Sequence, residues 1–391
     1  MDFKKVINLI TSVFNNSEVE FPQDIDFNDL FNFAQSQQIV NLIYLALKKS
    51  KNFQTNQIIN QALIGVWQNS QRSEMQVSEA DKILEAFSKN GIDHMPLKGV
   101  RLKKLYPSHD LRLMSDCDIL VKTEQYEKIK PIMESLGFTF KTESDHEYVW
   151  IKNTIYVELH KCLIPSYNKD YYAYFGDGWS KAHETDSPCL YEMTKEDEFI
   201  YILTHFAKHY RDGGIGIKHL LDLWVFLNTY KNLDNEYLEK NLKEIKLYKF
   251  YQNILSVLDN WFNNGEETEI TRIITEVVFT NGSFGTEKNH IISSALRESK
   301  ERKTTAGARV SHILAVSFPN LKVMELKYPI LKKAPVLLPF LWIHRGFTAF
   351  IFRRHNVSKQ MDILQQINGD EISDYKAQLN FVGLDFNFPE E

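Results

Sequence analysis

The amino-acid sequence predicts an α+β fold, in which a small mixed β-sheet core has helical regions before and after it. Runs of β-branched and apolar residues cluster near the middle of the chain, between about residues 94 and 160. Apolar residues recur at helical spacing over residues 27–47, and the helical pattern returns from Thr194 onward. We therefore predict three units: an N-terminal helical region (1–77), an α/β core (78–190) and a C-terminal helical region (191–391).

Length and composition set the general class of protein. The 391 residues are enough for two or three packed units, and the formal net charge of −5 gives no overall attraction to nucleic acid. The three cysteines are too few for a disulfide framework, and the N-terminus lacks the features of a signal peptide. We expect a cytoplasmic protein with no integral membrane segment.

The elements of the predicted core follow one another in a regular order. A helix over residues 70–89 leads to a strand at 94–97, and a short helix at 100–105 stops before Pro107. The remaining core elements are a strand at 117–121, a helix at 123–136 kinked by Pro131 and ended by Gly137, a hairpin of 138–142 with 148–152, and a strand at 155–159. Farther along, helices are predicted at 195–210, 216–230, 235–263, 287–300 and 306–316.

Two aspartates occupy alternate positions at the start of the strand predicted at 117–121. Side chains alternate between the two faces of a strand, so Asp116 and Asp118 lie on one side and Cys117 on the other. Neighbouring carboxylates repel each other unless a cation lies between them. We predict that Asp116 and Asp118 bind Mg²⁺, with Mn²⁺ as an alternative. The competing interpretation is a solvated strand edge.

A third carboxylate lies on the strand predicted at 155–159. By the same alternation, Glu158 and His160 share one face of this strand, and Val157 and Leu159 share the other. Glu158 is expected to complete the metal site or to act as a general base on an attacking hydroxyl. His160 is expected to bond Glu158 or a phosphate, unless it is purely structural. The alternative is a sheet with one polar face in water.

Lys98, Gly99 and Arg112 form the predicted phosphate-binding side of the site. A glycine lets the backbone approach a phosphate closely, and either cation can neutralise phosphate charge. The cations that follow on the same helix are expected to form a solvated face; these are Arg101, Lys103 and Lys104.

Residues of the C-terminal helical region are expected to line the same cleft. His205, Lys218 and Asp222 are predicted there, in contact with a base, a ribose or an acceptor. A competing interpretation groups His205, His209 and Asp212 as a phosphohydrolase-like metal cluster, because the histidines are one helical turn apart. That segment lacks a His-Asp dipeptide and a glutamate between the histidines, so we favour the first interpretation.

The segment 334–351 is strongly apolar, but two prolines, a histidine and an arginine interrupt it. It is too interrupted to span a membrane. We expect a helix packed into the domain or used as a homodimer interface, with an interfacial membrane helix as the alternative. Basic residues dominate residues 302–359, which is compatible with contact to RNA.

These motifs together resemble a known family. Leu97-Lys98-Gly99, Arg112, Asp116-Cys117-Asp118 and Val157-Glu158-Leu159-His160 resemble the bacterial uncharacterised nucleotidyltransferase family of the polymerase-beta-like nucleotidyltransferase superfamily. The resemblance extends over most of the chain. It implies a minimal palm-like core and transfer of a nucleoside monophosphate from a nucleoside triphosphate, with release of pyrophosphate and use of two Mg²⁺ ions.

The resemblance also assigns roles to residues. Asp116 and Asp118 match the paired metal carboxylates of the superfamily, and Glu158 matches the third. The superfamily commonly has Gly-Ser at the phosphate-binding turn, where this chain has Lys98-Gly99. The resemblance does not imply an acceptor, which can be a small molecule, a peptide, a protein or RNA.

Three functional hypotheses follow. The first is a Mg²⁺-dependent nucleotidyltransferase with an unidentified acceptor. The second is a non-catalytic module that binds a nucleotide or a partner through a nucleotidyltransferase-like core. The third is an RNA-directed enzyme that modifies tRNA or acts as a toxin.

Overall fold

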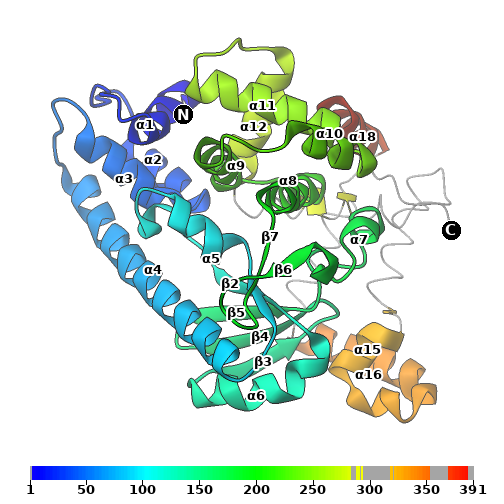
Figure 1. Ribbon diagram of the computed structural model, residues 1–391. Coiled ribbons are helices and arrows are strands. Elements are labelled where there is room, and N and C mark those ends of the chain that lie inside the picture. The colour runs from blue at the N-terminus through cyan, green and yellow to red at the C-terminus, as the bar shows by residue number, and fades with distance from the viewer. Residues whose placement is uncertain are drawn as a thin grey trace.

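A computed structural model describes residues 2–282, 288–290, 292–293, 318–319, 321–352 and 369–385 (Figure 1). It has the predicted α+β architecture, with a five-stranded mixed sheet. Helical regions precede and follow the sheet in the sequence. The predicted helices at 287–300 and 306–316 lie largely or wholly outside the described residues.

The N-terminal region consists of four helices that pack on the rest of the helical core. They are α1 (Phe3–Phe14), α2 (Phe27–Ser36), α3 (Val40–Lys49) and α4 (Gln57–Lys89). Asp2, Asp26 and Asn56 cap three of them by accepting hydrogen bonds from first-turn N–H groups. The helix predicted at 70–89 is the second half of α4, which is 33 residues long. The expected boundary at 77/78 therefore falls within a continuous helix.

The sheet has the strand order β1-β2-β5-β4-β3. Its strands are β1 (His94–Pro96), β2 (Asp116–Val121), β3 (Thr139–Glu143), β4 (Glu147–Lys152) and β5 (Ile155–His160). β2 and β5 are parallel, whereas the other neighbours are antiparallel, including the predicted β3–β4 hairpin. The other elements of this unit are α5 (Lys98–Leu102), α6 (Tyr126–Ser135), α7 (Lys169–Phe175) and a small β6 (Ala182–Glu184)–β7 (Tyr191–Met193) hairpin.

The two faces of the sheet have different chemistry because strand side chains alternate. Cys117, Ile119, Val157 and Leu159 are fully buried in a core that also contains side chains of α4 and α6. Asp116, Asp118, Glu158 and His160 lie on the opposite face by the same alternation. The sheet is therefore packed on one side and polar on the other. Figure 1 shows α4 and α6 beside the sheet and further helices beyond its opposite side.

Helices of the C-terminal region lie on the polar side of the sheet. They are α8 (Lys195–Arg211), α9 (Ile217–Thr229), α10 (Asn235–Glu244), α11 (Tyr248–Phe262) and α12 (Glu269–Asn281), and α18 (Gly369–Val382) packs against α11 and α12. The prediction of one helix over 235–263 is wrong. Lys246 has a φ of 58°, a left-handed conformation that ends α10 and turns the chain into α11.

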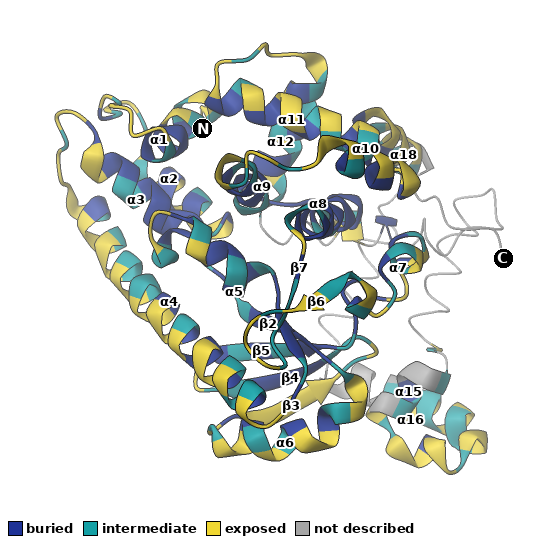
Figure 2. Ribbon diagram, in the orientation of Figure 1, coloured by how far each residue is buried: buried dark blue, intermediate teal, exposed yellow. Residues whose placement is uncertain are grey.

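The apolar segment near residue 340 is less packed than its sequence predicts. It forms α16 (Leu338–Phe352), which follows α15 (Leu321–Lys327) and short 3₁₀ turns. Val336, Phe340 and Ile343 are 77, 68 and 71% exposed, so the expectation of a helix packed into the domain is wrong for this face. Figure 2 shows the mixture of exposed and half-buried residues there. Among the described residues, no helix is both long and apolar enough to cross a membrane.

The prediction of a solvated basic face after Gly99 is wrong for Lys103 and Arg101 and holds for Lys104. Lys103 is fully buried, and its ammonium donates hydrogen bonds to the Ser73 hydroxyl and the His109 carbonyl. Burial and the nearby Arg112 guanidinium lower the pKa of Lys103 to about 8. Arg101 pairs with Glu198 of α8, and Lys104 is exposed at the surface. The side chain of Lys103 therefore helps to join α4 to the 3₁₀ turns before β2.

Candidate active site

The carboxylates of β2 and β5 are brought together by the parallel register of these strands. Asp118 is opposite Glu158, and Asp116 is opposite Tyr156. Adjacent strands are about 4.8 Å apart, so the Asp118 and Glu158 side chains lie next to each other on one face. Asp116 lies two residues along β2, about 6.6 Å from Asp118 at ~3.3 Å per residue.

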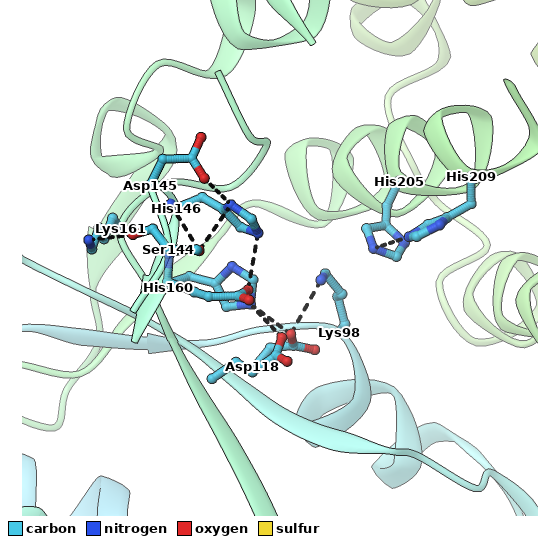
Figure 3. A network of polar contacts seen from close by, with 11 residues as sticks. Lys98, Asp118, Ser144, Asp145, His146, His160, Lys161, His205 and His209 are labelled. Atoms are coloured by element: carbon cyan, nitrogen blue, oxygen red, sulfur yellow. Dashed lines mark hydrogen bonds and ion pairs between the residues drawn. The ribbon is translucent and has the colours of Figure 1, made fainter. Parts of the chain in front are cut away.

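Asp118 has two cationic or polar partners. The Nε2 atom of His160 lies 2.7 Å from Oδ1 of Asp118, and the ammonium of Lys98 donates to the same oxygen at 3.3 Å (Figure 3). His160 Nε2 also lies 3.7 Å from a Glu158 oxygen. Asp118 and His160 are buried, and Glu158 is half-buried. A single cluster thus joins three of the predicted residues to Lys98.

Burial and mutual repulsion make the charges in this cluster unequal. Burial raises the pKa of Glu158 to about 8, with the help of Asp116 and Asp118. Burial and Asp118 likewise raise the pKa of Asp116. Burial opposes ionisation of Asp118 too, but Lys98 and His160 outweigh it and hold the pKa of Asp118 below its usual range. In the absence of a bound cation, the charge of Asp118 is therefore balanced by protein side chains, whereas that of Glu158 is not.

The donor set fits a divalent metal ion. One ligand atom from each of Asp118, Glu158 and His160 lies within 4.8 Å of the others, and no other group of three such ligands occurs among the described residues. Carboxylate oxygens with an imidazole nitrogen suit Mn²⁺, and carboxylates suit Mg²⁺. Sequence reasoning placed Asp116 in the metal set. The structure instead groups His160 with Asp118 and Glu158, because the His160 imidazole reaches both carboxylates.

The Lys98-Gly99 turn has an unusual backbone. Lys98 has a φ of 34°, which is costly for a residue with a side chain, and it begins the five-residue helix α5. Leu97 donates its N–H to the Asp118 carbonyl at 3.0 Å, which ties this turn to β2. The turn thus holds the Lys98 ammonium beside the Asp118 carboxylate.

Gly99 has a packing reason in addition to the one predicted from sequence. A Cβ atom at this position would lie 2.9 Å from the Met114 sulfur and 3.0 Å from Arg112 Nη1. Both side chains are buried, so neither can move away freely. A glycine is therefore required for Arg112 and Met114 to pack against α5.

Arg112 and Asp222 form a buried ion pair. The Arg112 guanidinium donates two hydrogen bonds of 2.7 Å to the Asp222 carboxylate, and the Tyr106 hydroxyl donates a third at 2.8 Å. Burial opposes the charge of Arg112, but Asp222 outweighs it and raises the pKa of Arg112. The pair connects the loop before β2 to α9, so it fixes the helical region against the sheet.

All ten residues predicted for the site line one cavity of about 490 Å³ between the sheet and the helices. They are Lys98, Gly99, Arg112, Asp116, Asp118, Glu158, His160, His205, Lys218 and Asp222. We call the strand side of this cavity the sheet wall (Asp116, Asp118, Glu147, Glu158 and His160) and the opposite side the helical wall (His205, Lys208, His209, Lys218, His219 and Asp222).

Sequence reasoning missed several lining residues. Glu147 and His146 come from the start of β4, where Glu147 is opposite His160 in register. Extending the strand alternation across the predicted hairpin would have placed Glu147 on the polar face. His219 and His290 gave no comparable signal, because only the packing of helices brings them to the cavity.

The competing metal cluster is not assembled in the described residues. His205 and His209 do approach each other, with their Nε2 atoms 3.1 Å apart. Asp212 is not among the residues that line the cavity, and these three ligands do not form a group within 4.8 Å. The structure therefore gives no support to a phosphohydrolase-like cluster.

A carboxylate pair on neighbouring strands of a small mixed sheet, facing a helical region across a cavity, is the arrangement expected of a nucleotidyltransferase. The chain belongs to the family described as uncharacterised nucleotidyltransferase, whose model matches residues 23–263, more than half of its length. A solved structure that is similar carries the description "Solution Structure of Antibiotic-Resistance Factor ANT(2'')-Ia Reveals Substrate-Regulated Conformation Dynamics". It shares 14% identity and a TM-score of 0.33, and the match covers 49% of this chain and 99% of that chain. No curated protein matches the chain significantly.

Proposed function

We propose that this protein transfers a nucleoside monophosphate from a nucleoside triphosphate to an acceptor hydroxyl, in a reaction that requires Mg²⁺ or Mn²⁺. The observation that carries the proposal is the pairing of Asp118 with Glu158 on parallel neighbouring strands, in a cavity that also contains Asp116 and Lys98. Membership of a nucleotidyltransferase family supports the reaction class.

In the proposed reaction, the acceptor oxygen attacks the α-phosphorus of the triphosphate. A bond forms between that oxygen and phosphorus, the bond from phosphorus to the β-phosphate oxygen breaks, and pyrophosphate leaves. The hydroxyl proton passes to Glu158, whose carboxylate lies beside Asp118 in the same cavity.

Asp116, Asp118 and Glu158, with His160, are the residues that would hold the divalent cation. When bound, such an ion neutralises charge on the phosphates and lowers the pKa of the acceptor hydroxyl. Lys98 is assigned to a phosphate oxygen, because its half-buried ammonium lies beside Asp118 and lines the cavity. Arg112 is assigned a positioning role, since Asp222 already occupies both arms of its guanidinium.

The acceptor is not assigned by these residues. The three cysteines, Cys117, Cys162 and Cys189, are unpaired, which favours a reducing compartment and hence a cytoplasmic acceptor. The alternative of a non-catalytic binding module is disfavoured, because each of the three expected carboxylate positions, 116, 118 and 158, carries an aspartate or a glutamate. All three side chains line the cavity.

The direct test uses triphosphates labelled at the α- or γ-phosphate, incubated with the protein, Mg²⁺ or Mn²⁺, and a host lysate. We expect label to enter an acceptor from the α position only, and pyrophosphate to be released. Transfer from the γ position would indicate a kinase. Nucleotide binding without any transfer in a broad set of lysate fractions would favour the binding module.

A further inference from the structure

The cavity is unusually rich in histidine. Half of the chain's 12 histidines line it, namely His146, His160, His205, His209, His219 and His290. His160 belongs to the proposed catalytic cluster on the sheet wall. His205, His209 and His219 are on the opposite side, and the proposed reaction gives them no role.

Three of these histidines are close neighbours on the helical wall. His205 and His209 are one turn apart on α8, and their Nε2 atoms are 3.1 Å apart (Figure 3). The ring of His219, on α9, has its centroid 6.3 Å from that of His205 and 6.1 Å from that of His209. His219 Nδ1 is buried and forms no hydrogen bond of normal geometry in the described part of the chain, although the nearby Gly216 carbonyl favours a proton on this ring. A buried nitrogen with a weak partner of this kind can hydrogen-bond a group that enters the cavity.

The surroundings of this histidine group are positive. Lys208 and Lys218 line the same wall, and the Lys98 ammonium faces it from the other side. Among the described lining residues of this wall, the one acid is Asp222, and the Arg112 guanidinium holds it in a bidentate pair. The helical wall therefore has cations and imidazoles but no carboxylate left to neutralise a bound metal.

The effect of these cations on the histidines agrees with this picture. Burial, followed by Lys98 for His205, Lys208 for His209 and Lys218 for His219, lowers the pKa of each imidazole well below its ordinary value. A second cation placed here would meet the same repulsion from the lysines. An anion would be attracted by the lysines and would accept hydrogen bonds from imidazole N–H groups.

We propose that His205, His209 and His219, with Lys218, form an oxyanion-binding subsite that takes a phosphate-type group. The group has two possible sources: the terminal phosphates of the substrate triphosphate, or an anionic group on the acceptor next to its reacting hydroxyl. With either source, the helical wall binds a negatively charged group of a substrate. The carboxylates of the sheet wall bind the metal ion. The choice between the two sources rests on the proposed function, but the existence of the subsite does not.

The test is a calorimetric titration of the metal-free protein, in EDTA, with inorganic phosphate and with pyrophosphate. We expect saturable binding that is weakened about tenfold or more in the double variant His205→Gln/His209→Gln, since loss of one good hydrogen bond to a charged group has this effect. Lys218→Met is expected to weaken binding similarly. The matched control is His183→Gln, which changes a half-exposed histidine of β6 outside the cavity and should leave binding unchanged.

A second arm identifies the source of the anion. Pyrophosphate is titrated into protein that is saturated with Mg²⁺ and a non-hydrolysable triphosphate analogue. Competition would assign the subsite to the triphosphate, and undiminished binding would assign it to an anionic acceptor.

Two results would overturn the proposal. One is an absence of saturable binding of either anion, or binding that the histidine and lysine variants do not alter. The other is stoichiometric binding of Zn²⁺ or Co²⁺ that is lost in the same histidine variant, which would make the helical wall a cation site. If anion binding is confirmed and no nucleotidyl transfer is ever detected, the subsite stands and the proposed reaction fails.

Discussion

The two walls of the cavity differ in charge and in the way the chain builds them. The sheet wall places Asp118 and Glu158 side by side through the register of two strands, with alternate residues on one face. The helical wall brings His205 of α8 and His219 of α9 together only through the packing of helices. The contrast teaches that the shared face of strand carboxylates follows from local alternation, whereas the cationic site opposite it has no local pattern and depends on helix packing.

The largest expected effect is on the sheet wall. Asp118→Asn should reduce nucleotidyl transfer by about 10³-fold or more, equivalent to roughly 4 kcal/mol of barrier, because it removes a charge that would hold the cation. The measurement is the rate of pyrophosphate release with each variant. The matched control is Glu143→Gln on β3, an exposed carboxylate of the same sheet that does not line the cavity.

A folding defect would confuse that result, so thermal unfolding is measured in parallel. Asp118 balances the buried Lys98 ammonium, and its loss is expected to lower stability as well. Glu158→Gln is the second variant, because Glu158 has no comparably close cationic partner. Full activity in a folded Glu158→Gln protein would remove Glu158 from the proposed site.

The next effect is on the contact that holds the two walls in place. Arg112→Met should destabilise the protein by about 3–5 kcal/mol, because it leaves the Asp222 carboxylate buried without its charged partner. Arg112→Met combined with Asp222→Leu should recover much of this loss, since both charges are then removed. Urea unfolding of the two single variants and the double variant measures the coupling.

A surface ion pair gives the control for this cycle. Glu239 and Lys243 are exposed neighbours on α10, so Glu239→Gln should change stability by less than about 0.5 kcal/mol. If Arg112→Met is as mild as Glu239→Gln, then the buried pair does not join the sheet to the helical region.

The smallest expected changes in the free energy of unfolding come from replacing either of two glycines with alanine. Gly99→Ala should cost about 1–3 kcal/mol, because the new Cβ would overlap the Met114 sulfur and the Arg112 guanidinium. Gly65→Ala should instead stabilise the protein by about 0.5–1 kcal/mol, because Gly65 is inside α4 and a Cβ there meets nothing within 4 Å. Chemical unfolding compares both variants with the wild type, and a neutral Gly99→Ala would show that Met114 can give way.

Much of the sheet wall could be predicted from sequence, because strand alternation alone assigns Asp116, Asp118, Glu158 and His160 to one face. The order of core elements and the hairpin are also confirmed. Sequence reasoning did not separate Asp116 from the group of Asp118, Glu158 and His160, since that difference depends on which carboxylates the His160 side chain reaches in the folded site.

Other features could not be predicted because they depend on contacts between distant segments. The burial of Lys103 follows from its bond to Ser73 of α4, which no local pattern indicates. The pairing of Arg112 with Asp222 joins residues 110 positions apart. The sequence suggested a phosphate contact for Arg112, but only the fold shows that Asp222 already occupies both arms of its guanidinium.

The most direct test of the central claim does not require the acceptor. Binding of Mn²⁺ is measured by electron paramagnetic resonance with and without a non-hydrolysable triphosphate analogue, in the wild type and in Asp118→Asn. We predict tight Mn²⁺ binding that depends on the analogue in the wild type and is lost in Asp118→Asn, while Glu143→Gln behaves as the wild type. Equal Mn²⁺ binding by the wild type and Asp118→Asn would contradict the assignment of the sheet wall as the metal–nucleotide site.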